Sequence, residues 1–336
     1  MSSSPTSPTT GSITLLPQPS SSSPTVSLTS LSKLYSYARS SPSPSDTLHP
    51  HVKEAVEVIE AALEEHGEEN VALSFNGGKD CTVLLHLLAA VLLHRHPPQS
   101  SSTPPWPAIP SIYVSQPSPF PLMESFVHSS TSYYSLSLLL TRHKSMKSAL
   151  SAYLSLRPWT KAIMVGTRRQ DPHGRELRFR QMTDPGWPAF ERIHPVINWG
   201  YAEVWWFLRE WEVPYCQLYD LGYTSLGSTY NTFPNPALAA KGGYRPAYEL
   251  EDESLERAGR EEGRSPVLVQ RQLQDAQAEQ GKWEVDGVEG HGGMNGSVLH
   301  PPEAEESGEV VAGEKGEVLV NAEMEEQEDE DDTGSL

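Results

Sequence analysis

The chain has 336 residues, 29 of them proline, and a formal net charge of −19. Its acidity is concentrated at one end: residues 1–260 carry 21 Lys and Arg against 23 Asp and Glu, and residues 261–336 carry 4 against 21. The total charge therefore does not exclude an anionic substrate, while the lack of an extended basic stripe argues against nucleic acid as a partner. Two cysteines, Cys81 and Cys216, and no apolar run long enough to cross a membrane predict a cytoplasmic protein without a membrane partner.

Residues 1–45 are rich in Ser, Pro and Thr and contain no acidic side chain, which predicts a disordered arm. Mitochondrial transit peptides share this composition but need several arginines. Only Lys33 and Arg39 are available here, so mitochondrial import is the minor alternative. Residues 263–336 are predicted to form a disordered acidic tail, and one folded domain is expected over 46–262. The sequence does not indicate an oligomeric state, and a monomer is compatible with it.

Apolar spacing predicts these elements in chain order: a helix over 52–66, a strand over 71–73, a helix over 83–92, a strand over 112–114, a strand over 136–140, a helix over 146–156, a strand over 162–165 and a helix over 201–210. The proline-rich stretch 96–110 is expected to be a surface loop. Strands that alternate with helices predict an α/β fold, with a mostly parallel sheet and helices on both faces. The aromatic helix over 201–210 is expected to pack on this sheet.

The segment Ser74–Asp80, of sequence SFNGGKD, joins the strand at 71–73 to the following helix. Gly77 and Gly78 permit positive φ angles and a close approach of the backbone to a ligand. The helix N-terminus adds partial positive charge, so the turn is suited to a phosphate group. The segment is shorter than the G-x-x-x-x-G-K-[ST] loop of nucleotide hydrolases and ends in Asp80. A glycine-rich turn without a ligand is the alternative.

A second polar segment, Gly166–Pro172, follows the strand at 162–165. The carboxyl end of a strand is where open α/β sheets bind ligands. Arginine forks match phosphate oxygens, so the arginines of this region predict contact with a triphosphate or a phosphorylated second substrate. They are Arg168, Arg169, Arg175, Arg178 and Arg180. A solvated basic face is the alternative for any one of them.

Four segments together resemble eukaryotic FAD synthase of the fungal type, an FMN adenylyltransferase related to phosphoadenosine-phosphosulfate reductases and to PP-loop ATP pyrophosphatases. They are FNGGKDCTVLL at 75–85, GTRRQDP at 166–172, TDPGWP at 183–188 and YTSLGST at 223–229. The resemblance implies an adenine-nucleotide alpha-hydrolase-like three-layer fold. It also implies transfer of AMP from MgATP to the 5′-phosphate of FMN, which gives FAD and pyrophosphate.

The resemblance also implies the residues of the site. The catalytic residues would be Asn76, Asp80, Asp171, Arg257 and Arg260. Asp80 and Asp171 would hold Mg²⁺, which takes one or two carboxylates and completes its shell with water and phosphates. The residues that would bind ATP are Ser74, Phe75, Gly77, Gly78, Lys79, Val114, Gly166 and Arg168. Those that would bind the flavin are Asp184, Trp187 and Arg192, although Trp187 could also be a residue of the core.

Two other functions fit the same scaffold. The stretch 219–227, YDLGYTSLG, also resembles the reductases, but those enzymes need a cysteine nucleophile near the C-terminus and no cysteine follows Cys216. The other alternative is a non-catalytic nucleotide-binding regulator whose acidic tail recruits partners. That alternative would fit a damaged catalytic set, whereas every implied catalytic residue is present.

Overall fold

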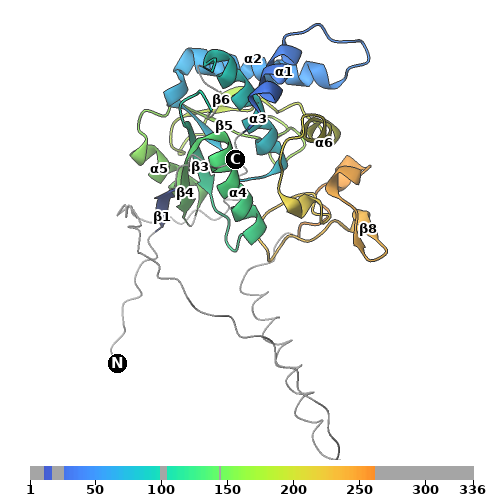
Figure 1. Ribbon diagram of the computed structural model, residues 1–336. Helices are drawn as coiled ribbons and strands as arrows, with labels where there is room; N and C mark the ends of the chain where they lie inside the picture. Colours follow the sequence, from blue (N-terminus) through green and yellow to red (C-terminus); the bar gives the residue numbers. More distant parts are fainter. Residues whose placement is uncertain (1–10, 17–25, 99–103, 144, 262–336) are drawn as a thin grey trace, which may run out of the picture. The chain divides into compact units, whose positions relative to one another are not determined.

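The computed structural model describes residues 11–16, 26–98, 104–143 and 145–261 (Figure 1). Within these residues the largest sheet has seven strands in the order β1-β4-β3-β2-β5-β7-β6. The strands are β1 (Ser12–Leu15), β2 (Val71–Ser74), β3 (Ile109–Val114), β4 (Leu136–Arg142), β5 (Ala162–Met164), β6 (Arg180–Met182) and β7 (Glu191–Ile193). Strands β4, β3, β2, β5 and β7 are parallel, and the edge strands β1 and β6 are antiparallel to their neighbours. The predicted, mostly parallel α/β sheet is confirmed.

Helices cover both faces of this sheet. Val71 and Leu73 of β2 belong to the larger of two apolar clusters, together with the buried sides of α2 and α3. Ala72, which points the other way, packs in the smaller cluster with Leu150 and Tyr153 of α5. The helices are α1 (Leu28–Ala38), α2 (Leu48–His66), α3 (Lys79–Arg95), α4 (Pro121–Tyr134), α5 (Met146–Leu156) and α6 (Tyr201–Glu210). The predicted three-layer arrangement is therefore present.

The remaining elements are short and lie mainly in the C-terminal third of the described chain. The 3-10 turns are η1 (Glu68–Asn70), η2 (Gln217–Tyr219), η3 (Pro236–Leu238), η4 (Ala247–Glu249) and η5 (Glu253–Leu255). Strands β8 (Ala239–Ala240) and β9 (Gly243–Tyr244) form a small hairpin. None of the helices in the described part of the chain is long and apolar enough to cross a membrane.

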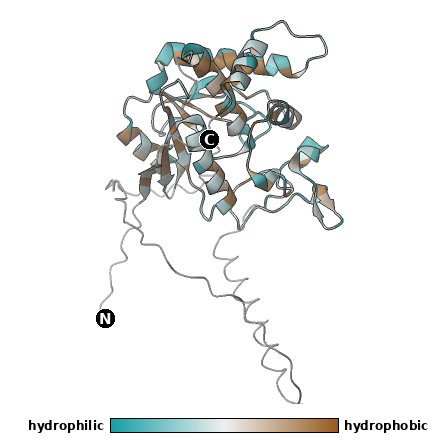
Figure 2. Cartoon of the chain, viewed as in Figure 1, coloured by the Kyte–Doolittle hydropathy of each residue, from teal (hydrophilic) through white to brown (hydrophobic). Residues whose placement is uncertain are grey.

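Helix α3 is buried along nearly its whole length, because other elements cover all its sides. It packs on α1, α2 and α6, and it follows directly from the central strand β2. Figure 2 shows hydrophobic residues on the helices that surround the central strands. A helix that is apolar all round is typical of such an interior position. The N-terminus of α3, at Lys79, is consequently held in place at the carboxyl end of β2.

The predicted disordered arm over 1–45 does not hold for the part of it that the structure describes. Strand β1 pairs with β4, and α1 packs on α3. Leu31, Leu34 and Ala38 of α1 are fully buried. Serine and proline dominate the average composition of this region and hide the short apolar repeat of a helix. The acidic tail predicted over 263–336 lies outside the described residues.

Other predicted elements are confirmed or need correction. Helices α5 and α6 have the predicted bounds. The predicted surface loop over 96–110 is partly wrong, because β3 already begins at Ile109 and Trp106 is buried, with its ring N–H donating to the carbonyl oxygen of Tyr134 over 3.2 Å. Helix α6 packs chiefly on α3 and α2, and its buried residues share the larger apolar cluster with residues of β2 and β5, while Trp206 remains 46% exposed. Helix α4 and strands β6 and β7 had no counterpart in the prediction.

Candidate active site

The turn between β2 and α3 has the tight geometry that its glycines predict. Gly77 has a φ of +77°, and a Cβ atom there would lie 2.5 Å from Sδ of Met123 and 2.9 Å from Cγ2 of Val127. Gly78 has an ordinary φ of −65°, so the predicted need for a positive φ holds at Gly77 alone. Phe75 is fully buried beneath the turn and Ser74 is half-buried. The buried Phe75 thus anchors the loop, and Asn76 is its solvent-exposed residue.

Asn76 is exposed, but its side chain has a defined orientation. Its Oδ1 accepts hydrogen bonds from the backbone N–H of Gly78 at 2.9 Å and from Sγ of Cys81 at 3.0 Å. Burial raises the pKa of the Cys81 thiol to about 12, so the thiol is protonated and can donate. With the carbonyl oxygen held by the loop, the NH₂ group of Asn76 is left to donate outward. Such a donor suits a phosphate oxygen.

The second predicted segment meets this turn through a close backbone contact. Gly166 follows β5, and a Cβ atom there would lie 2.7 Å from the backbone nitrogen of Cys81. Any larger side chain would therefore push the start of α3 away from the sheet. Because of this approach, the segment that begins at Gly166 brings Arg168 and Asp171 next to Asp80.

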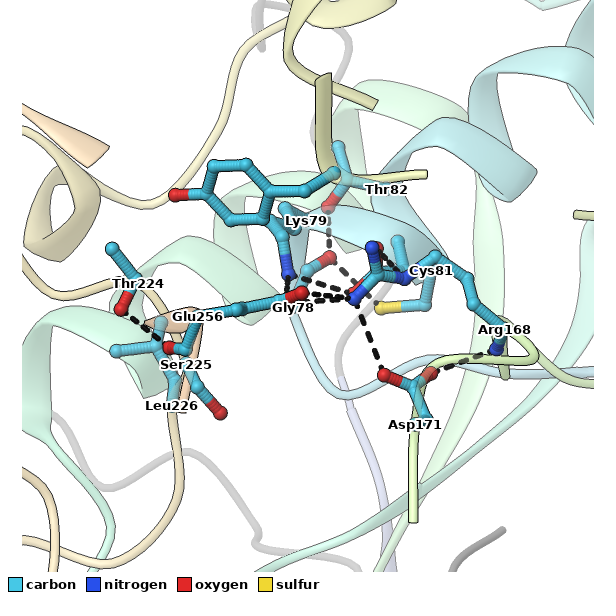
Figure 3. Close-up of polar contacts among 12 residues, drawn as sticks. Gly78, Lys79, Cys81, Thr82, Arg168, Asp171, Thr224, Ser225, Leu226 and Glu256 are labelled. Carbon is cyan, nitrogen blue, oxygen red and sulfur yellow. Dashed lines mark hydrogen bonds and ion pairs between the residues drawn. The ribbon is translucent and has the colours of Figure 1, made fainter. Parts of the chain in front are cut away.

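Lys79, Asp80, Arg168 and Asp171 belong to a charge cluster. Figure 3 shows Lys79, Arg168 and Asp171 of this cluster. Arg168 is completely buried. Its Nε lies 2.9 Å from Oδ1 of Asp80 and its Nη2 lies 3.2 Å from Oδ1 of Asp171, while its backbone N–H donates to Oδ2 of Asp171 at 2.7 Å. Lys79 is also buried, and its Nζ lies 3.1 Å from Oδ2 of Asp80. Both cations thus contact carboxylates from beneath the loop.

A third carboxylate completes the charge cluster, and sequence analysis did not assign it. Glu256 is buried, and Nη2 of Arg168 donates to both of its carboxylate oxygens at 2.7 Å. Nζ of Lys79 also donates to Oε1 of Glu256. Glu256 immediately precedes the arginine pair that the sequence singled out, but it lies 88 positions from Arg168. The only available signal was an acidic residue beside Arg257 in a segment already thought functional.

The pKa directions follow from this arrangement. Burial alone would lower the pKa of Arg168, but Asp80, Glu256 and Asp171 raise it above its ordinary value, so the guanidinium stays charged. Burial raises the pKa of Asp171, and Asp80 adds to this effect while Arg168 opposes it. Burial would also raise the pKa of Glu256, yet Lys79 and Arg168 outweigh it and lower the pKa. Glu256 is therefore the more firmly ionised of these two carboxylates.

The predicted arginine-rich phosphate site needs correction, because the five arginines do not converge. Arg168 is buried among carboxylates, so the structure gives no support to its direct contact with phosphate. Arg169 donates to Oδ1 of Asn198 at 2.7 Å, on the surface. Arg180 pairs with Glu191 and Glu65 at the edge of the sheet. Of Arg168, Arg169 and Arg180, Arg168 is the one whose side chain contacts Asp80 at the phosphate turn, and sequence spacing could not show this.

The two C-terminal arginines, Arg257 and Arg260, also lie in different environments. Arg260 is half-buried, and its Nη1 donates to the carbonyl oxygen of Leu226 at 3.0 Å and to Oγ of Ser225 at 3.4 Å. Its guanidinium lies against Gly227, where a side chain would collide with it. Arg257 is exposed. Arg260 thus fastens the end of the described chain to the segment 223–229, whereas Arg257 is accessible to a ligand.

The residues assigned to the flavin form a separate group. Nη2 of Arg192, on β7, donates to Oδ2 of Asp184 at 3.1 Å. Asp184 is exposed, while Trp187 is half-buried against the smaller apolar cluster, as is Val114. Arg192 is paired with Ile163 of β5 in the sheet. The structure thus brings Asp184 together with Arg192 through their side chains and with Trp187 through a backbone hydrogen bond of 3.1 Å, around strand β7.

Asp80 and Asp171 have the donor chemistry for Mg²⁺. In the described part of the chain, no group of three or more His, Cys, Asp and Glu side chains is placed to hold a metal ion. Mg²⁺ does not require such a group, because it is commonly held by one or two carboxylates together with substrate phosphates and water. Oδ1 of Asp80 is buried and, within the described residues, accepts no hydrogen bond, although Nε of Arg168 lies beside it. The pair therefore fits a magnesium ion that also contacts a phosphate.

Comparisons with known proteins place the chain in a family. Residues 70–234 match the model of the phosphoadenosine phosphosulfate reductase domain. A probable FAD synthase of Schizosaccharomyces pombe is 44% identical over 203 residues, which cover 60% of this chain and 76% of that protein. Flavin adenine dinucleotide synthase of Saccharomyces cerevisiae is 33% identical over 204 residues, covering 57% and 66%.

A solved structure is similar over nearly its whole length. The FMN adenylyltransferase of Candida glabrata, in complex with FAD and inorganic pyrophosphate, has a TM-score of 0.63 and 27% identity and covers 69% of this chain and 98% of that one. The relative from Schizosaccharomyces pombe is more than 30% identical, and this chain covers more than two thirds of its length. The chain belongs to the FAD synthase family.

Proposed function

We propose that this protein transfers the adenylyl group of MgATP to the 5′-phosphate of FMN, giving FAD and pyrophosphate. Its sequence relatives are named FAD synthases, and the similar solved structure binds FAD and pyrophosphate. The observation that carries the proposal is the placement of Asp80 and Asp171 together at the phosphate turn, with Arg168 beneath both. That arrangement supports a site for a metal-bound polyphosphate.

The reaction needs no covalent intermediate with the protein. The FMN phosphate is already anionic at neutral pH and can attack the α-phosphorus in line, so catalysis comes from alignment and charge stabilisation. The NH₂ group of Asn76 would donate to a phosphate oxygen. Mg²⁺ held by Asp80 and Asp171 would supply positive charge for the triphosphate. Arg168 would act by holding the two aspartates in place.

The flavin would be recognised beyond β5, by the group that contains Asp184, Trp187 and Arg192. Arg192 orients the Asp184 carboxylate, which can then accept a hydrogen bond from the flavin edge. Trp187 offers a ring face next to this pair. The exposed guanidinium of Arg257 is assigned to a substrate phosphate, and Arg260 to the support of the loop at 225–227.

The thiol-based alternative lacks a suitable group. Cys81 and Cys216 are both buried and unpaired, and burial raises the pKa of each. A buried, protonated thiol is a poor nucleophile. A non-catalytic regulator would be expected to lack some of the charged residues of the site, whereas both aspartates and both cations of the charge cluster are present. A cytoplasmic location stays a prediction from the sequence.

The test is a direct assay of the purified chain with ATP, Mg²⁺ and FMN, followed by chromatographic separation of the flavins. We expect FAD to form, and label from α-labelled ATP to appear in FAD while label from γ-labelled ATP appears in pyrophosphate. Riboflavin should not replace FMN, because it lacks the attacking phosphate. Production of ADP without pyrophosphate would contradict the proposal, since it indicates a kinase.

A further inference from the structure

Glu256 is the member of the charge cluster whose purpose the reaction does not explain. It comes from the end of the described chain, far from the phosphate turn in sequence, and its carboxylate is buried. Its backbone is fixed independently of the turn. Oγ1 of Thr224 donates to the carbonyl oxygen of Glu256 at 2.6 Å, and Nδ2 of Asn235 donates to that of Leu255 at 2.7 Å. The carboxylate is thus delivered to the cluster by a firmly held segment.

Lys79 and Arg168 each contact the Glu256 carboxylate and also the carboxylate of at least one of the two aspartates. Nη2 of Arg168 lies 2.7 Å from each oxygen of Glu256 but 3.2 Å from Oδ1 of Asp171. Nζ of Lys79 is likewise shared between Glu256 and Oδ2 of Asp80. A cation that serves two carboxylates neutralises each of them less than one that serves a single partner. Glu256 therefore competes with both aspartates for positive charge.

The balance of charges shows what this competition does. The charge cluster holds two cations and three carboxylates, so one negative charge is in excess. Without Glu256, Lys79 and Arg168 would match Asp80 and Asp171 one to one. A divalent cation would then have to displace satisfied ion pairs before it could bind. In a buried setting such pairs are costly to break.

We propose that Glu256 is a positioning residue that draws Lys79 and Arg168 toward itself and so keeps Asp80 and Asp171 available to Mg²⁺. The inference rests on the proposed function in one respect, namely that these two aspartates hold the metal. It assigns to Glu256 no contact with substrate. Residues that act behind metal ligands in this way commonly change metal affinity by about ten- to hundredfold when they are replaced.

The primary test measures Mn²⁺ binding to the full chain, with the electron paramagnetic resonance signal of free Mn²⁺ as the readout. Asp80→Asn defines the background, because the many acidic residues beyond 261 can also bind Mn²⁺. Glu256→Gln is expected to weaken the remaining binding about tenfold. The half-saturating Mg²⁺ concentration for FAD formation should rise by the same factor, while KM for FMN stays unchanged.

Glu253→Gln is the matched control. Glu253 belongs to the same C-terminal segment and also fastens it, since its carboxylate accepts hydrogen bonds from the backbone N–H groups of Tyr201 and Ala202 at the start of α6. Its carboxylate lies at α6, outside the charge cluster. Its replacement should lower thermal stability and leave Mn²⁺ binding unchanged. An equal loss of Mn²⁺ binding in Glu253→Gln would mean that Glu256 merely holds the segment in place.

Lys79→Gln tests the same charge balance by removing a cation instead of a carboxylate. Alone, it removes a competing cation and should strengthen Mn²⁺ binding; in the Glu256→Gln background it should restore much of the lost affinity. The single variant keeps the inference testable even if Glu256→Gln does not fold. Wild-type Mn²⁺ affinity in Glu256→Gln, or no gain in Lys79→Gln, overturns the inference. If the wild-type chain made no FAD while these Mn²⁺ shifts occurred, the proposed function would fail and the role of Glu256 would stand.

Discussion

The charge cluster and the flavin group are both built from charged side chains, but they are stabilised in opposite ways. The cluster joins residues of α3, the segment after β5 and the C-terminal segment, and Arg168 at its centre is 0% exposed. The flavin group is local: Asp184 and Arg192 are eight residues apart and the carboxylate is 65% exposed. The first region depends on the completed fold, whereas the second depends on two adjoining strands. Removal of the central cation should therefore affect stability in the first region, whereas substitutions in the flavin group should affect substrate affinity.

Arg168→Met should have the largest effect of all. It leaves the buried Glu256 and the half-buried Asp80 and Asp171 with one cation fewer, and breaking a buried ion pair in this way costs about 3–5 kcal/mol. We expect a matching loss in the free energy of unfolding, measured by urea denaturation, together with loss of FAD formation. Arg169→Met is the control, because that neighbour is exposed and should change stability little. Equal stability of the two variants would show that the cluster is not a structural centre.

Asp80→Asn should retain the fold and lose turnover. The amide keeps the shape of the side chain but removes the charge that would hold the metal ion. We expect kcat for FAD formation to fall about hundredfold at saturating substrates, since each 1.4 kcal/mol or so of lost stabilisation is about tenfold in rate. Asp220→Asn provides an exposed control, where the carboxylate accepts a hydrogen bond from Tyr215. A near-normal kcat in Asp80→Asn would show that Asp80 does not hold the metal ion.

Asp184→Ala and Arg192→Ala should act on one substrate only. Because Asp184 and Arg192 pair with each other and are assigned to the flavin, we expect KM for FMN to rise about tenfold, the equivalent of one lost charge-assisted hydrogen bond, with KM for ATP unchanged. Steady-state kinetics with each substrate varied in turn would measure both. Arg245→Ala, which removes an exposed ion pair with Glu249, should change neither. A parallel rise in both KM values would mean that the two regions are coupled.

Glu191→Gln should give the smallest effect, at the sheet edge that carries the flavin group. Burial would raise the pKa of Glu191, but Arg180 and His66 outweigh it and lower the pKa below its ordinary value of 4.5. A lowered carboxyl pKa contributes stability above the ordinary pKa, and this contribution is lost as the pH falls. Thermal melts should show a loss of about 1 kcal/mol at pH 7 that shrinks progressively as the pH falls below 4.5. Glu57→Gln, at an exposed ion pair, should show no such dependence.

Sequence reasoning succeeded where the signal is local. The phosphate turn, α5, α6 and the central strands follow from apolar spacing and glycines within single segments. It failed for α1, whose three buried positions are diluted by serines. It also did not show that Arg168 contacts carboxylates, because arginine density in a sequence does not show where a side chain points. Glu256 could not be predicted, since nothing near it in the sequence marks Lys79 and Arg168 as its partners. The order of elements was therefore predictable, whereas the pairing of buried charges was not.

The late position of Glu256 also bears on how the protein is made. Lys79 and Arg168 leave the ribosome long before residue 256, because the contacts that join them to Glu256 span 177 and 88 positions. A nascent chain that ends before Glu256 has the complete sheet, yet its two buried cations share only Asp80 and Asp171. Contacts of such long sequence separation form late, after local structure is in place. Full metal affinity should therefore arise only after residue 256 has been translated, and truncated products should compete less well for Mg²⁺ in the cell.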